Sequence, residues 1–209
     1  RWIDAAVPSW TGVVTGEYEG YDGREFLQER RLFRDCYEVI NAKCGGRVSE
    51  ARKRLKEDLL EAGFSKLEGE DAQELVAHFP ELAETRTRIP EVLRDGHGSA
   101  SLAKLDVLLE EYSNSAPGCR LLSMAYAEAG ELLTCKTILE KCIKMGGADA
   151  HALTDLALVL RRLTGDDSMA ADCVERALAL SPGCKRALEL RETLPGGKHG
   201  FRRQQAGTP

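Results

Sequence analysis

The amino-acid sequence predicts an all-α protein in which antiparallel helical hairpins stack into a short solenoid, with an extended arm at the N-terminus. Two observations support this fold class. Apolar residues recur every three or four positions through most of the second half of the chain. Gly130 and Gly165 lie 35 positions apart, and each separates two such helical patterns. A period in the thirties is typical of helix–turn–helix repeats, which bury their apolar faces on one another.

The bulk composition is that of an ordinary soluble chain. Of 209 residues, 43% are hydrophobic and 30% charged, and no apolar run approaches the roughly 20 residues that a membrane helix needs. We therefore expect no transmembrane segment, and peripheral membrane association only through partners. The formal net charge of −5 does not favour binding to a polyanion, so nucleic acid is disfavoured as a partner.

Cysteine usage bears on the cellular compartment. The seven cysteines form no CxxC pair and have no histidine at metal-ligand spacing, which argues against a disulfide framework and against a zinc site. We expect an intracellular, reducing compartment. The chain starts with Arg1 and resembles a product from which a presequence has been trimmed, so an organellar and in particular a mitochondrial location is the expectation.

Residues 1–22 are predicted to form an extended aromatic arm. They gather both tryptophans and two of the five tyrosines among Gly, Pro, Ser and Thr, without a helical period. Aromatic side chains are costly to leave in water, so the arm either packs across its own helices or docks on a partner. The candidate partner-binding residues are Trp2, Trp10, Tyr18 and Tyr21.

Residues 23–98 are predicted to hold a helical hairpin and a less regular helical region. Apolar spacing indicates one helix over residues 23–44 and a second from Ser49, a candidate N-cap, to Gly63. Next comes a helix near residues 70–79. It breaks at Pro80, and a short segment follows Pro90, a residue that suits the first turn of a helix.

The basic run at residues 52–56 alternates with acidic residues, which is typical of a solvated helix face rather than a phosphate site. Residues 96–98, Gly-His-Gly, resemble a hinge, and we set the domain boundary there. The predicted repeat array covers residues 99–195. It comprises a leading helix, two full hairpins that turn at Gly130 and Gly165, and a capping helix from Cys184 to Leu194. Residues 196–209 form a polar, basic tail that we expect to be flexible.

Over about residues 100–194 the pattern resembles the tetratricopeptide and pentatricopeptide repeat superfamily. The resemblance implies turn glycines, small residues where paired helices approach closely, and a proline that ends a second helix. Arg161 departs from it, because the family usually has an aromatic residue there. The positions that carry the resemblance are Tyr126, Gly130, Cys135, Cys142, Gly165, Ala170, Ala177 and Pro182.

The small-residue positions give the cysteines a packing role, because a free Cys is more often a small buried hydrophobe than a reactive group. The pentatricopeptide branch resembles RNA readers, but those need many repeats in tandem. No catalytic motif is recognisable: the four histidines are scattered, and neither GxSxG nor a Walker-type loop occurs.

The sequence thus predicts a non-catalytic protein–protein interaction scaffold, not an enzyme, without cofactor or metal. Its expected partners are other protein subunits of a larger assembly, for which a mitochondrial complex is the expectation. The alternative is an RNA- or ribosome-associated helical-repeat factor that uses the basic tail, where Lys198, Arg202 and Arg203 lie. A third reading is an enzyme, which would need a cleft built across helices. One hyper-reactive cysteine, detected with a thiol probe, would favour that reading.

Overall fold

The computed structural model describes residues 46–94, 99–165 and 167–195. This part of the chain is entirely helical and contains no strand, so the predicted all-α class is confirmed for it. None of its helices is long and apolar enough to cross a membrane. The aromatic arm, the helix over residues 23–44, the separator at 96–98 and the basic tail lie outside the described residues.

In chain order, the helices are α3 (Arg47–Glu61), α4 (Glu70–His78), the 3-10 turn η1 (Pro80–Leu82), α5 (Ala83–Arg94), α6 (Ser99–Tyr112), α7 (Ala116–Glu128), α8 (Leu132–Cys142), the π turn η2 (Ile143–Gly147), α9 (Ala150–Thr164), α10 (Asp167–Leu180) and α11 (Lys185–Thr193).

Two features of the sequence set the ends of α9. The Asp149 carboxylate accepts a hydrogen bond of 2.7 Å from the Ala152 N–H and so caps the first turn. Gly165 ends the helix in the left-handed conformation, with φ 65°, which residues with a Cβ adopt only at a cost. The predicted turn at Gly165 is therefore observed, and so is the one at Gly130, where φ is 76°.

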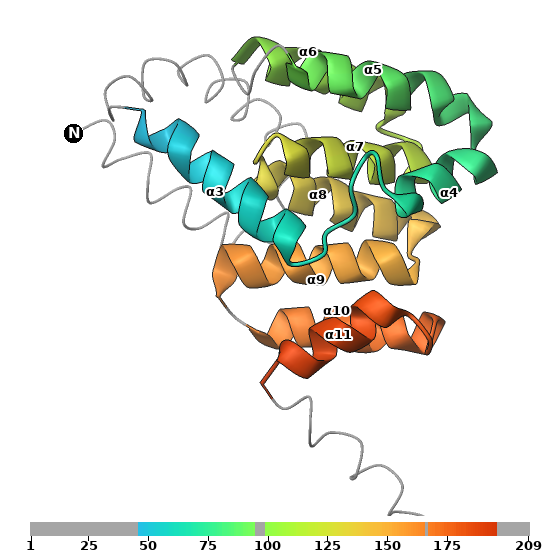
Figure 1. The fold of residues 1–209 in the computed structure, drawn as a ribbon. Helices are drawn as coiled ribbons and strands as arrows, with labels where there is room; N and C mark the ends of the chain where they lie inside the picture. Colours follow the sequence, from blue (N-terminus) through green and yellow to red (C-terminus); the bar gives the residue numbers. More distant parts are fainter. Residues whose placement is uncertain (1–45, 95–98, 166, 196–209) are drawn as a thin grey trace, which may run out of the picture.

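Helices α5 to α11 pack in chain order, each against the next, and we call them the hairpin stack. In Figure 1 they follow one another from α5 and α6 at the top to α10 and α11 at the bottom. Additional contacts join α5 to α7 and α9 to α11. Residues 118–127 of α7 and 152–160 of α9 are buried without interruption, so these two helices form the middle of the molecule.

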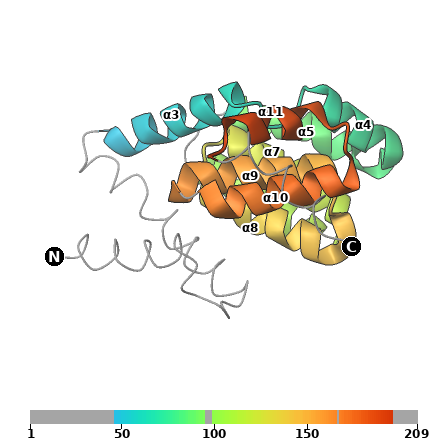
Figure 2. The ribbon, with the colours of Figure 1, turned by 90° about the horizontal axis from the view of Figure 1, so that it is seen from below.

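Figure 2 shows what covers the two middle helices. Helices α8 and α10 lie on one side of α7 and α9, and α3, α4 and α11 lie on the other. We call residues 46–79 the strap; it consists of α3, the non-helical segment 62–69 and α4. In Figure 1 the strap passes in front of the stack. Its buried apolar residues are Leu59, Phe64, Leu67, Ala72 and Leu75.

Two predicted helix boundaries are wrong. Helix α3 begins at Arg47 after Gly46, so Ser49 lies within the helix and is not its N-cap. Pro90 lies inside α5 and does not open a helix. A proline there removes one backbone hydrogen bond. The neighbouring Ile89 is fully buried, and its burial favours a helix that runs through the proline.

Candidate functional site

The most distinctive contacts of the molecule join the strap to the face of the stack formed by α5, α7, α9 and α11, which we call the inner face. Each of these four helices contributes one side chain that binds the main chain of strap residues 63–67. On α5, the Arg86 Nε donates a 3.0 Å hydrogen bond to the Leu67 carbonyl. On α7, the Glu128 Oε1 accepts a 3.0 Å bond from the Leu67 N–H.

The other two helices bind the main chain of strap residues that precede Leu67. On α9, the Asp155 Oδ1 accepts a 3.1 Å bond from the Ser65 N–H. On α11, the Arg186 Nε donates a 2.9 Å bond to the Gly63 carbonyl. We call these four side chains, Arg86, Glu128, Asp155 and Arg186, the main-chain clamp. Because the clamp binds backbone groups, these four bonds do not depend on the identity of most strap side chains.

Apolar burial accompanies the clamp. The Phe64 and Leu67 side chains are only 2% and 1% exposed, whereas the intervening Lys66 is exposed. Burying two such side chains stabilises the contact by about 2 kcal/mol each. The strap segment is therefore held by its backbone and by two side chains three positions apart.

A cluster of polar side chains lies beside the clamp; we call Ser65, Asp71, His151, Asp155 and Arg186 the polar cluster. Asp71, at the start of α4, is its centre. Its Oδ2 accepts bonds of 2.6 Å from the Ser65 hydroxyl and 2.7 Å from the Arg186 guanidinium. Its Oδ1 lies 3.1 Å from the His151 Nδ1. Arg186 also forms an ion pair with Asp155, so one guanidinium links α4, α9 and α11.

These contacts shift the acid–base properties of the cluster. The hydrogen bond from His151 lowers the pKa of Asp71 well below its usual value, and Ser65 and Arg186 add to the effect against the opposing influence of burial. The same hydrogen bond raises the pKa of His151. Burial lowers the pKa of Arg186, but the carboxylates of Asp155 and Asp71 outweigh it and raise the pKa overall. The cluster thus favours an ionised Asp71 beside a charged Arg186 and a protonated His151.

One acceptor of the clamp is not used. The Asp155 side chain is fully buried, and its Oδ2 has no hydrogen-bond partner among the described residues. A buried carboxylate oxygen without a donor is unfavourable. The strap therefore does not satisfy all the bonding capacity of the inner face.

Helix α3 adds a second anchor near the α7–α8 turn. Arg52 and Glu131 form an ion pair there, and the strap's Asp58 pairs with Arg162 of α9. The backbone of α3 also comes very close to the turn: a Cβ on Gly130 would lie 2.7 Å from the Arg52 carbonyl oxygen. Gly130 thus serves both the left-handed turn and the approach of the strap.

The residues that the sequence singled out lie elsewhere. Tyr126, Cys135, Cys142, Ala170 and Ala177 are buried, and their side chains form no part of the clamp or the polar cluster. Pro182 is exposed two residues after α10 ends. Trp2, Trp10, Tyr18 and Tyr21 lie outside the described residues.

The five described cysteines are all free and buried. Burial raises the pKa of four of their thiols. For Cys142, burial and the neighbouring Cys119 raise the pKa to about 12. Among the described residues, no group of three or more His, Cys, Asp and Glu could hold a metal ion.

Sequence reasoning missed the clamp and the polar cluster. One signal was available: Asp155 is a lone acid within an otherwise apolar run of α9, and a charge at such a position needs a partner. Its partners, Ser65 and Arg186, are too distant in the sequence for any local pattern to indicate them.

No protein-family model, curated protein or solved structure matches this chain. Its function must therefore be argued from its own geometry. The inner face holds a non-helical segment by its main chain, buries two apolar side chains and pairs one carboxylate with His151 and Arg186.

Proposed function

We propose that this chain is a non-catalytic protein–protein interaction scaffold that serves as an accessory subunit of a multiprotein complex. The observation that carries the proposal is the main-chain clamp. Four helices each direct one side chain to the backbone of a non-helical segment, through Arg86, Glu128, Asp155 and Arg186. Hydrogen bonds to the main chain provide affinity in several modes of peptide binding, while buried side chains provide specificity.

We also infer that α5 to α11 are a tetratricopeptide-like stack, in which α5, α7, α9 and α11 are the first helices of successive units. Two features favour this reading. Packing in chain order is what a solenoid requires, and left-handed glycines close the turns after α7 and α9. In such a stack the first helices share one face, and this is the face that the strap covers.

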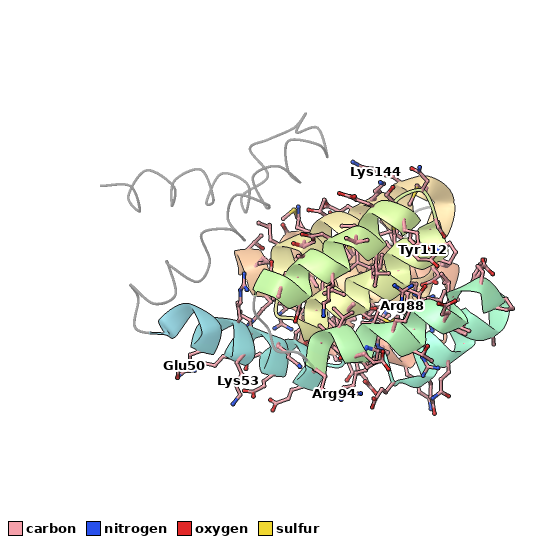
Figure 3. The ribbon with its side chains drawn as sticks, turned by 90° about the horizontal axis from the view of Figure 1, so that it is seen from above. Glu50, Lys53, Arg88, Arg94, Tyr112 and Lys144 are labelled. Carbon is pink, nitrogen blue, oxygen red and sulfur yellow. The ribbon has the colours of Figure 1, made fainter. Side chains whose placement is uncertain are left out.

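The basic residues of α3 do not favour the alternative of an RNA-associated factor. Arg54 lies 2.5 Å from Glu50, and Lys53 lies 3.9 Å from Glu57, so the cations share their face with acids. Figure 3 shows Glu50 and Lys53 on the same outward side of α3. A phosphate backbone needs positive charges that are not neutralised in this way.

The proposal can be tested by isolating the protein under native conditions at its natural abundance. We expect it to elute far above the 23.0 kDa of a single chain and to crosslink reproducibly to one partner in fixed stoichiometry, with or without ribonuclease treatment. Elution as a monomer without a stoichiometric partner would contradict the proposal. Loss of the association on ribonuclease treatment would support the RNA alternative instead.

A further inference from the structure

We propose that strap residues 62–73 are an internal ligand of the inner face, and that a partner binds by replacing them with a segment of the same chemistry and backbone conformation. This inference rests on the proposed function and names the partner's recognition element. The first argument is that all four clamp contacts are made to the main chain of residues 63–67. A different chain that adopts the same backbone conformation, with a glycine at the position of Gly63 where φ is 92°, can make these four hydrogen bonds.

The strap's side chains define what such a chain must carry. Phe64 and Leu67 are buried, so, with positions counted from Phe64, the segment needs apolar residues at its first and fourth positions. Ser65 is buried between them and requires a small residue at the second position. Asp71 requires a carboxylate at the eighth position, where it pairs with His151 and Arg186. This is a short acidic–apolar segment.

The inner face accepts an acid because it provides cations at that point. Facing Asp71 are His151 of α9 and Arg186 of α11, and the only other carboxylate of the polar cluster is Asp155. A partner segment with a basic residue at the eighth position would bring a third cation to the cluster and would be rejected.

The strap is an imperfect ligand, and this lowers the free-energy cost of replacing it. The Asp155 Oδ2 is fully buried and has no donor among the residues that the structure describes. A competing segment that supplies one more N–H or O–H at this point makes a hydrogen bond that the strap cannot make. The free energy of this additional hydrogen bond offsets part of the effective-concentration advantage that the strap has because it belongs to the same chain.

The strap can also be exchanged without breaking the packing between the hairpins. The contacts that join α7, α8, α9 and α10 to one another do not involve it. Its outward side chains are polar and exposed, among them Lys66, Glu68 and Glu70. When the strap is displaced, these residues only change from one aqueous environment to another.

The test uses a labelled peptide with the sequence of residues 62–73 and the full chain in two forms. In one form, Phe64→Ala and Leu67→Ala weaken the internal ligand and leave the inner face intact; the other is the wild type. We expect the peptide to bind the double variant saturably and the wild type at least tenfold more weakly. A peptide with the same two alanines, and one with Asp71→Asn, should both bind the variant more weakly than the parent peptide.

Phe79→Ala is the matched control, because Phe79 is an apolar residue of the same region that is 38% exposed. The control protein should bind the peptide no better than the wild type. A double variant that keeps its helical circular dichroism and cooperative thermal transition but binds no peptide would overturn the proposal. Equal binding by variant and wild type would overturn it as well.

If the double variant does not fold, the wild type provides the decisive measurement. A large excess of the peptide should accelerate hydrogen exchange at the Ser65 and Leu67 amides, which donate to the clamp in the free protein. Unchanged exchange at millimolar peptide would overturn the proposal. Either failure would contradict only the replacement of the strap. The scaffold function would still be tested by crosslinking in the native complex, because a partner can bind another surface.

Discussion

The strap and the hairpin stack are both helical, yet different interactions hold them in place. The four stack helices α7 to α10 pack through apolar side chains on neighbouring elements, and two of them have long stretches with no exposed residue. The strap also buries apolar side chains, but it is attached in addition by ion pairs and side chain–main chain hydrogen bonds to residues far along the sequence, up to 123 positions in the bond from Arg186 to Gly63.

This difference separates two kinds of stability within one small protein. Apolar packing between neighbours tolerates hydrophobic substitutions that conserve volume and responds little to pH. Buried charges depend on every partner, since removal of one partner leaves the others without compensation. The stack should therefore behave as the persistent part of the molecule, and the strap as the part that single substitutions and solution conditions can release.

The largest expected effect concerns the thiols of the stack. In a chain with Cys36→Ser and Cys44→Ser, the remaining five cysteines are buried, and burial raises the pKa of four of them. Their reaction with a thiol reagent should be slowed at least about a thousandfold relative to the urea-unfolded chain, as expected for groups exposed only by unfolding. One cysteine that reacts at the unfolded rate would contradict the persistent stack and reopen the question of catalysis.

The next effect concerns the strap. Arg186→Met should lower the free energy of unfolding by about 3 kcal/mol, because it leaves the buried Asp155 and the neighbouring Asp71 without their common cation. Urea denaturation measures the loss. Lys185→Met on the same helix is the matched control, since Lys185 is exposed, and should change stability by less than about 0.5 kcal/mol. Equal effects of the two substitutions would mean that the polar cluster does not hold the strap.

Alanine substitutions at two turn glycines distinguish the stability cost of backbone strain from the cost of a clash with the strap. Gly165→Ala should cost about 1 kcal/mol, because its φ is 65° but no atom lies within 4 Å of the added Cβ. Gly130→Ala should cost at least about 2 kcal/mol, because the same strain is joined by a clash with the Arg52 carbonyl. Thermal unfolding of the two variants compares them directly. If both cost the same, α3 is free to move away from the turn.

The smallest effect is the pH dependence. The raised pKa of His151 means that its stabilising charge is fully present below the ordinary histidine value of 6.5 and is lost as pH rises through the folded pKa. The lowered pKa of Asp71 adds stability that is present above 3.8 and lost only in stronger acid. The stability difference between wild type and His151→Gln should therefore be greatest between these values and shrink at alkaline pH.

The matched control for the pH experiment is His78→Gln. His78 is exposed on α4, and its ring nitrogen contacts the Glu74 carbonyl rather than a carboxylate. Urea midpoints measured across the pH range compare the two variants. A difference that is the same at every pH for His151→Gln would show that the imidazole charge does not contribute to holding the strap.

The sequence predicted the local part of this structure well. The helical patterns, the turns at Gly130 and Gly165 and the final helix after Cys184 all follow from residues within a few positions of one another. The start of α3 and the interior Pro90 were predicted wrongly, because in both cases contacts outside the segment outweighed a local preference.

The candidate site could not be predicted in the same way. Its main-chain bonds link the segment around Ser65 to four helices, and the partners Asp155 and Arg186 lie 90 and 123 positions away from the strap residues they bind. The non-helical segment 62–69 shows no helical period in the sequence. A segment that is ordered by side chains from elsewhere shows no period of its own.

The separation of Gly63 and Arg186 along the sequence also determines an order of events during synthesis. The strap leaves the ribosome first, and its last binding helix is added 123 residues later. At about 5–20 residues per second, this interval is roughly 6 to 25 s. During that time the apolar Phe64 and Leu67 have no complete inner face to cover them, so a nascent chain exposes this segment to chaperones and partners before it can bind its own protein.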